Sequence, residues 1–144
     1  MDKIKVLVAG AYGRMGREVV KAVVAQDDLE LVGTVDKMGA GKEIGQVCGL
    51  GDLGIKVEVD LTAAIRKAGA EVVVDFTTPL TVMDNIKATL AAGVAAVIGT
   101  TGLTEENQEE ISALATQVGK GAIVAPNFAL GAVLMMRFAQ EAAR

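Results

Sequence analysis

Three glycines near the amino end have the spacing of a phosphate-binding turn. Gly10, Gly13 and Gly16 follow Ile4 to Ala9, a short β-branched run typical of a strand buried on both faces. Valines at three- and four-residue spacing over residues 19–24 then predict a helix. Glycine allows a sharp turn and close backbone approach, and free N–H groups at a helix N-terminus bind anions. The G-x-x-G-x-x-G spacing departs from the commoner G-x-G-x-x-G pattern, so it indicates phosphate binding only in this strand–helix context.

An acidic residue further along the chain indicates a nucleotide at this turn. Asp36 ends a second apolar run, Leu29 to Val35, and lies twenty positions past Gly16. A carboxylate at this place accepts hydrogen bonds from both hydroxyls of an adenosine ribose. The neighbouring Lys37 has two interpretations, as the partner of a 2′-phosphate or as a solvated surface lysine. The pair predicts a nicotinamide dinucleotide and leaves the choice between NADH and NADPH open.

The composition restricts the chemistry that the chain can perform. Its 144 residues are 51% hydrophobic and 3% aromatic, as expected for a single α/β domain in which small-residue helices cover buried parallel strands. The net charge of −4, without a basic cluster, argues against nucleic-acid binding. One cysteine, Cys48, and no histidine exclude an intrachain disulfide, a cysteine-based metal site and histidine catalysis. Without a signal-like or membrane-spanning run, we expect a cytoplasmic protein with no membrane partner.

The rest of the chain alternates strands with helices. We expect a helix from Asp60 to about Ala68, a strand over 71–76, a helix with Pro79 in its first turn that reaches about Ala92, a strand over 94–98, a helix starting near Thr104 and a strand over 122–125. Such connections require parallel pairing and right-handed crossovers, which predicts a Rossmann-type doubly wound sheet. The glycine-rich stretch from Met38 to Ile55 is expected to be a mobile surface loop, with Cys48 an ordinary loop thiol.

Polar or glycine-containing clusters follow five of the predicted strands. They are Gly10 to Gly16, Asp36-Lys37, Phe76-Thr77-Thr78, Gly99-Thr100-Thr101-Gly102 and Ala125-Pro126-Asn127-Phe128. In a doubly wound sheet the ligand lies outside the carboxyl ends of the strands. Each cluster alone fits an ordinary turn equally well, but five clusters on one edge predict a dinucleotide crevice.

Four of these segments resemble a known family. Gly-Ala-Tyr-Gly-Arg-Met-Gly, Asp-Phe-Thr-Thr-Pro, Gly-Thr-Thr-Gly and Ala-Pro-Asn-Phe, in this order and at these distances, resemble the dihydrodipicolinate reductases, also called 4-hydroxy-tetrahydrodipicolinate reductases. The resemblance covers essentially the whole chain. It implies an oxidoreductase that transfers hydride from NADH or NADPH to a cyclic dicarboxylate in the diaminopimelate route to lysine.

The resemblance also implies a role for each cluster. The pyrophosphate would be cradled by Gly10, Ala11, Tyr12, Gly13, Arg14 and Met15, and the adenosine ribose would be held by Asp36. Lys37 stands where the family often has a basic residue that recognises NADP, which suggests tolerance of both cofactors. The nicotinamide would be bordered by Phe76 and Thr77, and its ribose or the substrate would be contacted by Gly99, Thr100 and Thr101. The site would be closed near a hinge by Ala125, Pro126, Asn127 and Phe128.

The resemblance further implies a substrate domain that this chain lacks. Family members continue into a segment with a His-His pair, a lysine and a Pro-Ser-Gly-Thr sequence. Residues 1–128 would be the dinucleotide-binding domain and residues 129–144 the final helix and hinge, with no catalytic residue and no turnover by the chain alone. The apolar side chains of residues 133–138 would face a missing surface or a second copy. A non-catalytic nucleotide-sensing module is the alternative, and the reading frame after Arg144 distinguishes the two.

Overall fold

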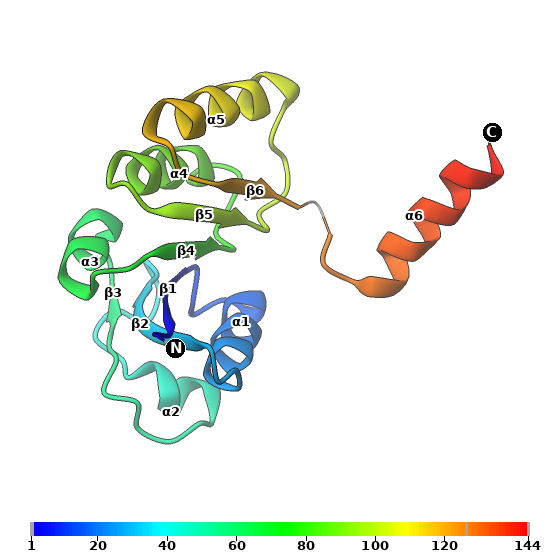
Figure 1. Ribbon diagram of the computed structural model, residues 1–144. Helices are drawn as coiled ribbons and strands as arrows, with labels where there is room; N and C mark the ends of the chain where they lie inside the picture. The colour runs from blue at the N-terminus through cyan, green and yellow to red at the C-terminus, as the bar shows by residue number, and fades with distance from the viewer. Residues whose placement is uncertain (1, 126, 144) are drawn as a thin grey trace.

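A single parallel sheet organises the protein. The computed structural model describes residues 2–125 and 127–143 (Figure 1). Its strands are β1 (Ile4–Ala9), β2 (Leu29–Val35), β3 (Val57–Glu58), β4 (Val72–Asp75), β5 (Ala95–Ile98) and β6 (Ala122–Val124). They lie in the order β3-β2-β1-β4-β5-β6, and every neighbouring pair is parallel. This order confirms the predicted doubly wound, Rossmann-type sheet.

Helices cover both faces of β1, as its apolar sequence predicts. The helices are α1 (Arg14–Val24), α2 (Ile44–Cys48), α3 (Leu61–Ala68), α4 (Val82–Ala91), α5 (Glu105–Val118) and α6 (Leu130–Ala142). Val6 and Val8 pack into one buried cluster with α1 and α2, whereas Leu7 and Ala9 pack into another with α3. Successive side chains of a strand point to opposite faces, so β1 is buried on both sides. Figure 1 shows α3, α4 and α5 following one another along the sheet.

The predicted ends of two helices are confirmed by their caps. The Asp60 carboxylate accepts the Ala63 N–H at 2.9 Å at the start of α3, and Gly69 ends that helix in the left-handed conformation. At the start of α5 the Thr104 hydroxyl accepts the Asn107 N–H while the Asn107 side chain accepts the Thr104 N–H. This reciprocal pair is a capping box.

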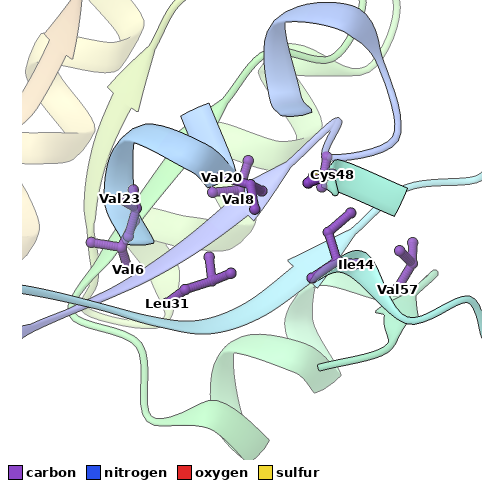
Figure 2. Close-up of a cluster of buried hydrophobic side chains, with 9 residues drawn as sticks. Val6, Val8, Val20, Val23, Leu31, Ile44, Cys48 and Val57 are labelled. Atoms are coloured by element: carbon purple, nitrogen blue, oxygen red, sulfur yellow. The ribbon is translucent and has the colours of Figure 1, made fainter. Parts of the chain in front are cut away.

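The prediction of a mobile loop over residues 38–55 is wrong. The stretch contains α2, and it ends beside β3, which the sequence pattern did not predict. Ile44 and Cys48 point into the buried cluster against Val57, as Figure 2 shows. The Glu43 carboxylate accepts N–H groups from Gln46 at 2.6 Å and Leu53 at 3.0 Å, which supplies the backbone partners that a glycine-rich chain needs. Cys48 is a packed side chain of this cluster, and its burial raises the pKa of the thiol.

Helix α4 starts later than predicted, and helix α6 is exposed along most of its length. Helix α4 begins at Val82, so Pro79 lies in the turn before the helix, where the Thr78 carbonyl accepts the N–H groups of Thr81 and Val82. Helix α6 forms where it was expected, but none of its described residues is buried. Its apolar side chains include Leu130, at 74% exposure. The helix lies apart from the sheet (Figure 1).

Candidate nucleotide-binding site

The carboxyl ends of five strands lie side by side. Ala9 of β1 is in register with Val35 of β2 and Asp75 of β4, and the alignment continues through Ile98 of β5 to Val124 of β6. The strand order reverses between β1 and β4, which is the topological switch point where ligands bind in such sheets. The five clusters predicted from the sequence therefore leave the sheet along one edge.

The glycine turn after β1 is closed by backbone contacts that exclude side chains. Gly10 has φ of +78°, and a Cβ there would overlap the Phe76 carbonyl. A Cβ on Gly16 would overlap the Gly10 carbonyl oxygen. Helix α1 then starts at Arg14 with Gly13 as its N-cap, without a side-chain cap or an acidic residue in its first turn. Its first N–H groups lack intrahelical partners and carry the positive end of the helix dipole, an arrangement that binds an anion.

Asp36 joins this turn to the end of β2. Its carboxylate accepts the Tyr12 N–H at 2.9 Å through Oδ2 and the Met38 N–H at 2.9 Å through Oδ1. An ionised carboxylate has about four lone-pair sites, so these two bonds leave one free site on each oxygen. Two free acceptors side by side match the two hydroxyls of a ribose. Lys37 is exposed beside Asp36.

Two cationic side chains lie close to the Tyr12 ring. The Arg17 guanidinium carbon is 4.7 Å from the centre of the Tyr12 ring, and the Lys42 Nζ is 5.1 Å from it. Lys42 also donates a hydrogen bond to the Tyr12 hydroxyl at 2.9 Å. This bond, reinforced by the charge of Lys42, lowers the pKa of Tyr12 below its ordinary value. Gly39 makes room for the ring, because a Cβ there would overlap it.

Replacing Lys42 by methionine is expected to raise the pKa of Tyr12 toward its ordinary value, because the neutral side chain neither donates to the phenolate nor attracts it. The chain has one tyrosine and no tryptophan, so phenolate absorbance during a pH titration reports Tyr12 alone. Lys37→Met is the matched control and should leave the titration unchanged. An unshifted curve for Lys42→Met would contradict the contact.

The loops after β4 and β5 meet at Phe76. Its N–H donates to the Ala9 carbonyl at 3.0 Å, and the Gly99 N–H donates to the Asp75 carbonyl at 2.9 Å. A Cβ on Gly99 would overlap the Phe76 ring, so the ring rests against the Gly99 backbone. The ring centres of Phe76 and Phe128 are 5.6 Å apart, which brings the end of the fifth predicted cluster to the same place.

Asp75 is a buried residue of this edge to which the sequence pattern assigned no role. Its carboxylate accepts from the Thr77 N–H at 2.9 Å, the Thr77 hydroxyl at 2.7 Å and the Thr100 hydroxyl at 2.8 Å. The Asn85 amide of α4 donates to its other oxygen at 2.8 Å. The sequence did contain one signal for such a role, the carboxylate at the end of the apolar strand Val72–Asp75. A charge that is buried in this way needs hydrogen-bond partners.

The remaining predicted site residues differ in their exposure and in their contacts. Arg14, Met15 and Thr101 are exposed, and Ala125 is half-buried at the end of β6. Asn127 accepts the Ala129 N–H at 2.7 Å and so shapes the chain before α6. Pro126 lies outside the described residues.

The described residues present neither a cluster of metal ligands nor a membrane-spanning helix. Within residues 2–125 and 127–143, no three histidine, cysteine, aspartate or glutamate side chains gather in a way that would hold a metal ion. No helix in this described part has the length and apolarity required to span a membrane.

Comparison with known proteins identifies a family. Residues 4–128 match the family model described as dihydrodipicolinate reductase, N-terminus. The chain is 50% identical over 145 residues to 4-hydroxy-tetrahydrodipicolinate reductase of Desulfitobacterium hafniense, covering 100% of this chain and 54% of the relative. It thus spans about half the length of the curated relatives that it matches.

Solved structures agree with this assignment. Dipicolinate-bound dihydrodipicolinate reductase from Paenisporosarcina sp. TG-14 superposes with a TM-score of 0.82 at 38% identity, over 98% of this chain and 54% of that one. Biliverdin reductase from Synechocystis sp. PCC 6803 shares the fold at 18% identity, with a TM-score of 0.70 over 84% of this chain and 37% of that one. The matches to the family model and to the relatives show that this chain belongs to the dihydrodipicolinate reductase family and corresponds to its N-terminal part.

Proposed function

We propose that the chain binds NADH or NADPH along the carboxyl edge of its sheet. The observation that carries the proposal is Asp36, whose two bonds to Tyr12 and Met38 hold a ribose acceptor beside an uncapped helix N-terminus. Gly10 and Gly16 support it, because a Cβ on either residue would overlap backbone atoms and prevent the tight turn that leads into this helix N-terminus. These features fit a dinucleotide.

Each cluster has a part in this proposal. The pyrophosphate lies against residues 10–15 and the adenosine ribose against Asp36. The nicotinamide half lies toward Phe76, Thr77 and the loop of residues 99–101, with residues 125–128 at the border. When bound, the cofactor supplies a hydride, and the residues of this chain bind and orient it.

We also propose the reaction that this half serves. In the complete family protein the hydride goes to a cyclic dicarboxylate, as the names of the relatives indicate for those proteins. The described residues contain no histidine, and the carboxylates of Asp36 and Asp75 at the strand ends accept hydrogen bonds from backbone or hydroxyl groups. The chain by itself is therefore expected to bind cofactor without reductase turnover.

Calorimetric titration of the 144-residue chain with NADH and NADPH tests the proposal. Saturable binding of at least one cofactor supports it. An absence of heat with both cofactors at millimolar concentration would contradict it, provided that circular dichroism shows a folded chain.

Replacing Lys37 by alanine should weaken NADPH about tenfold and leave NADH nearly unchanged, because only NADPH offers a 2′-phosphate to the lysine. The ratio of the two calorimetric affinities is the measurement. Lys67→Ala is the matched control, since that exposed lysine pairs with Glu58. Equal losses for both cofactors would show that Lys37 does not distinguish them.

A further inference from the structure

A carboxylate without a cationic partner lies behind the nicotinamide side of the proposed site. Asp75 is 3% exposed, and no ion pair among the described residues includes it. The strand residues before it are valines. Burying a charge costs free energy, and its neutral partners here, Thr77, Thr100 and Asn85, offset that cost only through hydrogen bonds. An apolar side chain could occupy the same position without burying a charge. The hydrogen bonds are therefore what distinguishes Asp75 from such a side chain.

The bonds join three segments that are separate in the sequence. Oδ1 receives Thr77, in the loop after β4, and Thr100, in the loop after β5. Oδ2 receives Asn85 from α4, and the same amide lies 3.3 Å from the Thr77 hydroxyl. One carboxylate thus sets the separation of the two loops and anchors both to a helix.

The Phe76 ring depends on that separation. The ring belongs to the residue between Asp75 and Thr77, and it rests against Gly99, the neighbour of Thr100. A change in the distance between the loops would move the ring or the Gly99 backbone. The adenosine side is separate, because Asp36 bonds to Tyr12 and Met38.

We propose that Asp75 is a positioning residue that holds the loops after β4 and β5 together and thereby shapes the nicotinamide half of the site. The inference rests on the proposed function, since it assigns the nicotinamide to these loops. Asp75 acts through Thr77, Thr100 and Phe76, and its influence is confined to the nicotinamide half of the ligand.

A pair of substitutions isolates this role. In Asp75→Asn the new amide oxygen can still accept from the threonines, but its NH₂ group faces the Asn85 NH₂ group, so two donors meet and the bonds to the threonines lose their charge. Adding Asn85→Asp restores a donor and an acceptor with the same atoms and the same total charge. Thr89→Val is the control, because Thr89 is also buried but bonds to the Asn85 carbonyl within α4.

The experiment compares NADH with ADP, which ends at the pyrophosphate, by calorimetry on the 144-residue chain. We expect Asp75→Asn to weaken NADH about tenfold and to leave ADP within about twofold. The double variant should return NADH to within about threefold of the unsubstituted chain. Thr89→Val should bind both ligands normally.

Four results would count against the inference. Equal losses of NADH and ADP affinity would mean that Asp75 only stabilises the domain, and unchanged affinities would mean that the loops do not need it. Failure of the double variant to recover NADH binding would remove the Asn85 contact from the explanation. If the unsubstituted chain bound neither ligand, the proposed function would fail, and the inference would fail with it.

Discussion

Replacement of Gly16 by alanine is expected to abolish measurable NADH binding and to lower the free energy of unfolding by about 3 kcal/mol or more. Gly16 is buried near the start of α1, and a Cβ there would overlap the Gly10 carbonyl oxygen and crowd the Ala11 Cα at 2.7 Å. Both obstacles are backbone atoms, so no side-chain rotation relieves the overlap. Denaturant unfolding and calorimetric titration measure the two effects.

Gly131→Ala is the matched control for this substitution. Gly131 is also near the start of a helix, but a Cβ there meets no atom within 4 Å. Alanine favours helix over glycine by up to about 1 kcal/mol, so this variant should be as stable as the original chain or more so. If Gly16→Ala were equally harmless, close packing of the glycine turn would not be required for the fold.

Replacement of Asp36 by asparagine is expected to weaken NADH about a hundredfold and NADPH much less, because a phosphate takes the place of the 2′-hydroxyl in NADPH. With NADH, the variant loses charge-assisted hydrogen bonds to two ribose hydroxyls, each contributing about 1.5–3 kcal/mol, and about 1.4 kcal/mol corresponds to tenfold in affinity. One of the backbone donors, Tyr12 or Met38, would also face the new NH₂ group. Calorimetry with both cofactors gives the two affinities.

Asp52→Asn controls for the loss of a carboxylate that accepts a backbone N–H. Asp52 accepts the Gly54 N–H at 2.8 Å in the stretch between α2 and β3. Its substitution should change cofactor affinity by less than about twofold. Similar losses for Asp36→Asn and Asp52→Asn would show that Asp36 acts on loop structure and not on the ribose.

The sequence predicted those helices and strands whose ends are defined by nearby residues of a characteristic type. Asp60 and Gly69 mark the two ends of α3, because a side-chain acceptor starts the helix and a left-handed glycine ends it. The strand Leu29–Val35 was predicted to the residue, because the burial of most of residues 31–35 imposes an apolar run. Once these elements alternate, parallel pairing follows, and it aligns the strand ends and their loops.

The glycine-rich stretch was mispredicted because glycine density hid a short apolar repeat. Ile44, Val47 and Cys48 have helical spacing, but a five-residue helix is stable only when tertiary contacts supply its energy. Those contacts come from β1 and α1, which are distant in the sequence. A local pattern contains no information about such partners.

Contacts between separate loops also could not be predicted from the sequence. Lys42 and Asp75 each act through residues far along the chain, Tyr12 in one case and Thr100 in the other. Residue type suggests that a buried carboxylate needs donors, but the identity of the donors depends on the strand register that brings Asp75 beside Ile98. The predicted clusters therefore located the edge of the sheet at which the candidate site lies, but they did not predict the contacts that hold its loops in place.

Amide chemical shifts recorded while the isotope-labelled 144-residue chain is titrated with NADH test whether the carboxyl edge of the sheet is the cofactor site. We predict saturable shifts at Gly10, Tyr12, Gly13 and Gly99, together with residues near Asp36. Shifts confined to the groove beside α5 and β6, which Ser112, Thr116 and Lys120 line, would contradict this location. The absence of shifts at millimolar NADH and NADPH would contradict cofactor binding itself.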